Sequence, residues 1–247
     1  MMHPHTARIQ KTSARILLLF LLGMALPLLT SAQHRPQLNL PKYDLKQYHF
    51  GFILGINQMF FSVNNVEEFD KMDSLYKLES TPELGFNIGI VSNLRLAEYW
   101  DLRFIPTLSF GERNLNYTFM LRNKQFYEDK KKVESTHIDL PLVVKFKSQR
   151  LNNFRAYILG GAKYSIDLAS QAKKKESDDE LRVKIERNDL ALETGVGFDF
   201  YTTYFKFGTE LKMSYGINDV LKQENTIYTR GIESMRSKIF QISFTFE

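Results

Sequence analysis

Apolar and polar residues alternate over most of the chain. The segment 137–150 reads HIDLPLVVKFKSQR, and every second residue from Ile138 to Phe146 is apolar. The residues between them include Asp139 and Lys145. A period of two places the two sets on opposite faces of an extended strand. The segment therefore predicts a β-strand with one apolar and one polar face.

The same alternation recurs along the chain and predicts eight strands, at 48–57, 83–96, 100–111, 137–150, 154–168, 188–200, 204–216 and 238–246. The short connections between them lie at 97–99, 150–153 and 201–203, and the long polar ones at roughly 58–82, 112–135, 169–187 and 217–237. Short turns at one end and long loops at the other are typical of an outer-membrane barrel. We predict an all-β fold, an eight-stranded antiparallel up-and-down transmembrane β-barrel over 48–247, with both termini at the short-turn end, in the periplasm.

The polar faces of these strands carry charges of both signs and many glycines. An eight-stranded barrel has an interior just wide enough to be filled by side chains, and charges buried there must pair. Glycines leave room for long charged neighbours. We therefore expect a structural polar network in the lumen, formed by Arg103, Asp139, Lys145, Lys163, Glu193, Lys206, Glu210 and Lys212.

A soluble, lipocalin-like barrel inverts this arrangement, with the apolar face lining a cavity and the charges in water. Alternation alone does not separate the two. The membrane version is favoured because glycines recur on the polar face, where an exposed surface gains nothing from them. The apolar face is also bulky and aromatic, in a chain with 20 Phe and 12 Tyr. The strict alternation of loop lengths points the same way.

The start of the chain predicts a cleaved signal peptide over 1–32. A basic opening precedes the apolar run 16–29, and the small residues Thr30, Ser31 and Ala32 come before Gln33. This is the pattern of a secretory signal, and the run is shorter than the roughly 20 residues of a membrane helix. We expect cleavage before Gln33.

Residues 33–47 are predicted to form a periplasmic N-terminal extension. Pro36 and Pro41 favour an extended, non-helical chain. Such a segment is either a plain linker or a contact for a partner, and Pro36, Pro41 and Tyr43 are the candidate contact residues. At its other end the chain finishes IFQISFTFE, with Phe246 followed by Glu247. Barrels of this class usually finish on an aromatic residue, so Glu247 is a mild departure.

Composition excludes several classes of function. The chain has a net charge of +5, and the predicted signal contributes three of these charges, so the mature chain is near +2. That is too little to indicate nucleic-acid binding. The absence of cysteine excludes disulfides, thiolate metal sites and a lipoprotein anchor.

Candidate chemistry is sparse, and we expect no enzyme, no cofactor, no metal site and no small-molecule substrate. After the signal the histidines are His34, His49 and His137, without a visible Ser/His/acid arrangement. A lipid-modifying barrel enzyme using His137 with a loop serine is the alternative. Glu193 and Glu210 face inward on adjacent predicted strands and suit either acid–base chemistry or, more simply, a salt-bridge network.

The predicted outer loops carry charge clusters. Lys130–Lys132 and Lys173–Lys175 can meet lipopolysaccharide phosphates, and Asp178–Glu180 can hold a divalent cation. The simpler interpretation of each cluster is a solvated loop. Membrane lipid and lipopolysaccharide are therefore the expected surroundings of the barrel.

Three segments resemble the PorT family: LPKYDLKQYHFGFILGIN, IDLPLVVKFKSQRLNNFRAYILGGAKYSIDLAS and ETGVGFDFYTTYFKFGTELKMSYG, at 40–57, 138–170 and 193–216. The resemblance implies an outer-membrane β-barrel of gram-negative bacteria that use type IX secretion. It implies a role in exporting proteins with C-terminal targeting domains, such as surface proteases and gliding adhesins, and other secretion components as partners. It brings no catalytic residues.

A filled eight-stranded barrel is no conduit for a folded protein. We therefore expect an accessory, non-enzymatic role in assembly or operation of the translocon. A free-standing adhesin-like barrel and an enzyme acting on lipid A remain the rival hypotheses.

Overall fold

The computed structural model describes residues 37–66, 75–120, 125–169, 183–223, 226 and 228–247. The predicted signal peptide, Pro36, Lys173–Lys175 and Asp178–Glu180 lie outside these residues. Within the described residues the elements are a 3-10 helix η2 (Tyr43–Leu45) and the strands β1 (Tyr48–Asn65), β2 (Leu75–Arg95), β3 (Trp100–Phe104), β4 (Thr107–Met120), β5 (Phe126–Lys147), β6 (Phe154–Asp167), β7 (Asn188–Tyr201), β8 (Lys206–Gly216) and β9 (Ile232–Phe246). No helix among them is long and apolar enough to cross a membrane.

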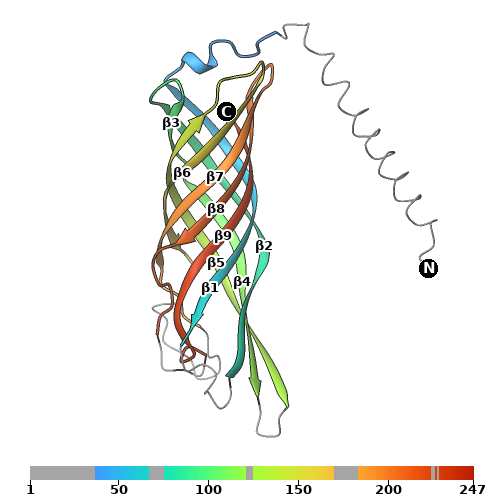
Figure 1. The fold of residues 1–247 in the computed structure, drawn as a ribbon, viewed down its shortest axis with the longest axis vertical. Helices are drawn as coiled ribbons and strands as arrows, with labels where there is room; N and C mark the ends of the chain where they lie inside the picture. Colours follow the sequence, from blue (N-terminus) through green and yellow to red (C-terminus); the bar gives the residue numbers. More distant parts are fainter. Residues whose placement is uncertain (1–36, 67–74, 121–124, 170–182, 224–225, 227) are drawn as a thin grey trace, which may run out of the picture. The chain divides into compact units, whose positions relative to one another are not determined.

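The strands close into one antiparallel barrel (Figure 1). The first strand, β1, pairs with both β2 and the last strand, β9, so the sheet has no free end. Strands β3 and β4 lie end to end between β2 and β5 and together occupy one strand position of the barrel. Each of them pairs with both β2 and β5. The predicted eight-stranded up-and-down topology is confirmed, with one of its strands split in two.

The split occurs at Ile105–Pro106, where proline has no N–H to donate to the ladder. The neighbouring backbone groups still find partners. Ile105 donates to the carbonyl of Pro141 at 3.2 Å, and Ile90 donates to the carbonyl of Pro106 at 3.0 Å. The interruption therefore costs little pairing.

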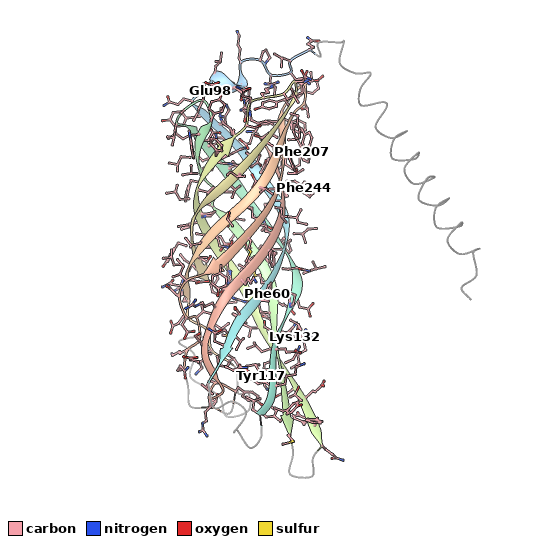
Figure 2. The ribbon with its side chains drawn as sticks, in the orientation of Figure 1. Phe60, Glu98, Tyr117, Lys132, Phe207 and Phe244 are labelled. Carbon is pink, nitrogen blue, oxygen red and sulfur yellow. The ribbon has the colours of Figure 1, made fainter. Side chains whose placement is uncertain are left out.

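The two faces of the barrel have the predicted orientation. Apolar side chains stand outward and remain exposed, as on β1 from Tyr48 to Ile56, whereas charged side chains point inward and are buried. Figure 2 marks two outward residues, Phe207 and Phe244, whose rings stack across β8 and β9 at 6.0 Å. Tyr48 to Ile56 spans roughly 26 Å along the strand at the usual rise. A strand tilt of about 40° makes this roughly 20 Å along the membrane normal, most of an apolar band of about 25 Å. The soluble alternative is wrong, because it needs these side chains inside.

The predicted long loops at 58–82 and 112–135 are wrong over much of their length. Strand β1 continues to Asn65 and β2 begins at Leu75, while β4 and β5 pair from Met120 and Phe126 onward. Strand β5 extends well beyond β6, whose last pair is Asp167 with His137, whereas β2 pairs with β4 almost to its end at Phe119 (Figure 1). The outer faces of these extensions are polar because they lie past the apolar band, so the apolar alternation that reveals a membrane strand is missing there.

An apolar cluster at this end explains part of the extension. Inward side chains from the extended strands pack with residues from the connections and close the long-loop end of the barrel. The buried members are Phe61, Leu75, Leu78, Leu115, Tyr117, Phe119, Val183, Ile185, Val220, Leu221, Ile232 and Met235. Their burial offsets the entropy of ordering these segments.

Candidate functional site

The part of the lumen nearer the short-turn end is organised around Arg103 on β3. Its guanidinium forms an ion pair with Glu210 of β8 and a second one, at 3.1 Å, with Glu247 after β9. All three side chains are fully buried. Glu210 also accepts a hydrogen bond from the hydroxyl of Tyr157 at 2.8 Å. Three strands far apart in the sequence are thus joined across the barrel.

A second group of charges lies beside the first. The ammonium of Lys145 on β5 is 2.8 Å from Asp199 on β7 and stands 3.5 Å from the ring centre of Tyr157. Lys206 on β8 is 2.9 Å from Glu247. Cation–π and ion-pair contacts of desolvated ammonium groups partly offset the cost of burying them.

The network continues toward the long-loop end. Asp139 on β5 accepts hydrogen bonds from Ser109 at 2.7 Å and Ser165 at 2.6 Å. Lys163 lies 3.9 Å from Asp139 and 4.0 Å from Glu193. Lys212 lies 3.5 Å from Glu193 and 3.8 Å from Glu210, so it joins this group to the central one. The structure thus places all eight residues of the expected lumen network in one connected set.

Sequence reasoning missed several members of this network: Tyr157, Lys147, Arg113, Asp167 and Glu247. Tyr157 and Lys147 stand at alternate positions whose side chains point inward in their predicted strands, so the alternation alone identifies them. Asp167 also stands at an inward position of its predicted strand, 154–168, whereas Arg113 lies beyond the predicted strand 100–111, where no such signal exists. Glu247 follows the outward residue Phe246, so its side chain points inward, where its carboxylate meets Arg103 and Lys206.

Glycines make the room that this network needs. A Cβ atom on Gly197 would overlap the ring of Tyr157, and one on Gly195 would lie 2.9 Å from Cγ of Lys212. The cavities that the described residues enclose in the lumen are small. One cavity near Asp101 and Lys147 and another near Arg113 and His137 each hold about 10 Å³, the space of about one water molecule.

Charged groups surround the candidate residues His137, Glu193 and Glu210 in the described part of the chain. Nε2 of His137 lies 3.1 Å from the Arg113 guanidinium and 3.4 Å from the Asp167 carboxylate. Within the described residues, no serine hydroxyl shares a hydrogen bond with that atom. The Glu193 and Glu210 carboxylates both contact Lys212, so their geometry is that of a salt-bridge network.

The short-turn end is covered by residues 39–47, which we call the clasp. Its Asn39 donates two hydrogen bonds to the barrel turns: the backbone N–H donates to Asn153 at 2.9 Å, and the side-chain amide donates to the carbonyl of Tyr201 at 3.0 Å. Asp44 lies 3.0 Å from Arg155 and accepts a hydrogen bond from the Tyr201 hydroxyl at 2.9 Å. The clasp therefore belongs to the same compact unit as the barrel.

Of the expected extension over 33–47, residues 39–47 are thus in contact with the barrel. Tyr43 stacks on His49 with ring centres 4.1 Å apart, and Lys206 lies 4.8 Å from the Tyr43 ring centre. Tyr43, a candidate partner contact, is thus engaged within the chain, whereas Pro41 remains exposed. The physical reason is that the barrel mouth carries arginines that need an acid, and Asp44 supplies it.

We expect the clasp to loosen in acid. Burial raises the pKa of Asp44, but Arg155, Tyr201 and Arg150 outweigh it and hold that pKa below its usual value. The stability that Asp44 gives to the clasp is therefore complete above the usual carboxyl pKa of about 4 and is lost as the pH falls below that value.

The substitution Asp44→Asn should raise protease cleavage within 39–47 about fivefold at pH 7, as expected for ~1 kcal/mol, and remove the acid dependence of cleavage. An unchanged cleavage rate would contradict this role; Asp129→Asn, at the other end, is the control.

These features define a class of protein. A closed eight-stranded barrel with an apolar exterior and a charged, filled lumen is a small outer-membrane β-barrel. The family model described as "Outer membrane protein beta-barrel domain" matches residues 31–222, and the chain belongs to this family. The outer membrane is therefore its location.

Solved structures give similar folds at low sequence identity. Ail of Yersinia pestis, solved in complex with the heparin analogue sucrose octasulfate, is 13% identical, with 81% of this chain and 99% of that chain covered and a TM-score of 0.41. OprG of Pseudomonas aeruginosa is 10% identical, with 86% and 97% covered and a TM-score of 0.42. Neisserial surface protein A is 11% identical, with 81% and 99% covered and a TM-score of 0.40. No curated protein sequence matches the chain.

Proposed function

We propose that this chain is a non-enzymatic outer-membrane subunit of a type IX secretion apparatus, as its resemblance to the PorT family implies. In this role it supports assembly or operation of the translocon rather than forming the channel. The filled lumen is the observation that carries this part of the proposal. Ion pairs such as Arg103–Glu210 and Lys145–Asp199 occupy the space that a passing chain would need.

The residues of the resemblance support the proposal further. Its most specific part, KSQRLNNFR at 147–155, supplies Arg150, Asn153 and Arg155, which bind the clasp. The clasp itself lies largely within another resembling segment, 40–57. Two of the segments that resemble the PorT family thus contribute to the same feature, the contact between the clasp and the turns at the short-turn end.

Exposed apolar side chains at the same end support partner binding there. Leu45 of the clasp is 73% exposed, Leu151 in the turn between β5 and β6 is 72% exposed, and Tyr204 before β8 is 89% exposed. Apolar side chains that group on a surface mark interaction sites, and we infer that these three contribute to one. Other secretion components at the periplasmic face are the proposed partners.

Deleting residues 33–47 in the native host is expected to abolish export of proteins with C-terminal targeting domains. The barrel should still insert, because its closure does not use this segment. Cargo in the culture supernatant is measured by immunoblot, and insertion by heat-modifiable migration of the barrel. Normal export without these residues would remove the clasp from the proposal.

A second variant keeps the clasp contacts and alters only its surface. Leu45→Asp combined with Leu151→Asp should weaken both export and co-purification of secretion components from detergent extracts. Lys132→Gln, at the opposite end, is the matched control and should leave both unchanged. Equal effects of the two variants would contradict partner binding at the short-turn end.

One observation favours a free-standing adhesin-like barrel as the second candidate. Strands β2, β4 and β5 extend beyond β6 at the long-loop end (Figure 1). Under this alternative no secretion component co-purifies with the barrel. Mass spectrometry of lipid A with and without the gene tests the remaining rival, an enzyme that modifies lipid A.

A further inference from the structure

Two cations stand on the outer surface of the barrel where the apolar band ends. Arg236 and Lys238 are outward residues of β9, and the next outward residues along this strand are Phe240, Ile242, Phe244 and Phe246. Lys238 lies opposite Phe60 of β1 and Tyr215 of β8. We call Phe60, Tyr215, Arg236, Lys238 and Phe240 the basic rim.

The basic rim lies on the long-loop side of the apolar band. Figure 2 places Phe60 between the outward residues Phe207 and Phe244 on one side and Tyr117 of the long-loop cluster on the other. Along β1 the exposed apolar residues stop at Ile56, and Gln58 follows before Phe60. This is the level at which lipid headgroups meet the barrel wall.

The positive charge of the basic rim is not balanced within the described part of the chain. No described acidic residue forms an ion pair with Arg236 or Lys238, and the Nε atom of Arg236 is buried without a hydrogen-bond partner. The hydroxyl of Tyr215 interacts with the side chains of Arg236 and Ser62. Both side chains are half-buried, and two neighbouring cations without a described acid are suited to an anionic ligand.

The lysines that the sequence suggested for this purpose are different. Lys130 lies 3.5 Å from Glu83, and Lys132 lies 3.5 Å from Glu112. Lys131 lies 3.2 Å from Asp129. Each of these ammonium groups already has an acid beside it, so none has the excess charge of the basic rim.

Aromatic rings hold the basic rim in place. The Lys238 ammonium lies 5.6 Å from the ring centre of Phe60 and 5.7 Å from that of Phe240. These distances fall within the range of cation–π contacts. Arg236 and Lys238 are two residues apart on one strand face, so their Cα atoms are roughly 7 Å apart. That spacing lets one phosphate group contact both side chains, with the acyl chains lying on the apolar residues below.

We propose that the basic rim binds the headgroup phosphate of an anionic membrane lipid. Arg236 donates hydrogen bonds to the phosphate oxygens, and Lys238 adds a point charge. The apolar residues from Phe240 to Phe246 contact the acyl chains of the same lipid. This site does not depend on the proposed secretory role.

The test uses native mass spectrometry of the purified full barrel in detergent. Phosphatidic acid and diacylglycerol with identical acyl chains differ only in the phosphate. The wild-type barrel is expected to retain phosphatidic acid and not diacylglycerol. Arg236→Gln combined with Lys238→Gln should lower the affinity for phosphatidic acid by about tenfold, as expected for loss of two charge-assisted contacts.

Matched variants make the outcome decisive. Lys130→Gln combined with Lys132→Gln removes the same charge from the same end and should leave binding unchanged. The site is overturned if the Arg236→Gln, Lys238→Gln variant binds phosphatidic acid as tightly as the wild-type barrel. It is also overturned if the Lys130→Gln, Lys132→Gln control loses as much affinity as that variant. Binding of inorganic phosphate alone as tightly as phosphatidic acid would overturn its assignment to a lipid. Should the double variant fail the heat-modifiability test of folding, Lys238→Gln alone gives the same comparison, with a loss of about threefold expected.

Discussion

Replacing Arg103 with methionine is expected to lower the free energy of unfolding by about 3–5 kcal/mol, because it leaves buried carboxylates without their main cation. Arg103 contacts both Glu210 and Glu247, and all three side chains are fully buried. Lys212 and Lys206 remain near these carboxylates, but neither takes the position between them. The loss should therefore approach that of a broken buried ion pair rather than that of a surface pair.

Urea unfolding of the barrel in lipid vesicles measures this effect, with the single tryptophan, Trp100, as the fluorescent reporter. Combining Arg103→Met with Glu210→Gln should recover part of the lost stability, since one of the two stranded charges is then removed. Lys132→Met is the control, because its pair with Glu112 is exposed and should be worth less than about 1 kcal/mol. If Arg103→Met lowered the free energy of unfolding no more than Lys132→Met does, the ion pairs of Arg103 with Glu210 and Glu247 would not stabilise the barrel.

Substituting Gly161 with alanine is expected to cost about 2–3 kcal/mol, as an overpacked core does. A Cβ atom at this position would overlap the carbonyl oxygen of Leu142 and lie 2.7 Å from Cα of Val143. Both are backbone atoms of the adjacent strand β5, so no side-chain rotation relieves the overlap. The strands must separate locally, and pairing between β5 and β6 weakens.

The neighbouring glycine provides the control for this prediction. Gly160 faces outward, and a Cβ atom there would have its nearest neighbour, the carbonyl oxygen of Glu193, at 4.0 Å. Gly160→Ala should change stability by no more than about 0.5 kcal/mol. The folded fraction after refolding into vesicles and the urea midpoint are compared for the two variants. Equal behaviour of the two would show that the inward position has no special steric role.

Strand positions and face orientation were predictable from the sequence because both follow from local periodicity. The alternation of Ile138 to Phe146 gives the outward face of β5, and its polar partners Asp139 and Lys145 are inward and buried. The same rule places Lys163 and Glu210 in the lumen. Where the outer face becomes polar, as from Glu112 onward on β4, the rule has no contrast to detect and the strand extension was missed.

The ion pairs inside the lumen were not predictable, because the alternation along a strand shows which way a side chain points but not which residue it contacts. Arg103 contacts Glu247 across the barrel, 144 positions away in the sequence. The clasp was missed for a related reason. Asp44 lies in a segment without periodicity, and its partners Arg150, Arg155 and Tyr201 become neighbours only when the barrel closes.

The sequence by itself determined an all-β barrel, the side of each strand that meets lipid, and a lumen filled with charges of both signs. These follow from a two-residue period that each strand expresses independently of the others. Only the tertiary structure decided which charges pair, that residues 39–47 cover the short-turn end, and that Arg236 and Lys238 stand without a described acid at the edge of the apolar band. Those features depend on strand stagger and barrel closure, which bring distant residues together and leave no trace in local patterns.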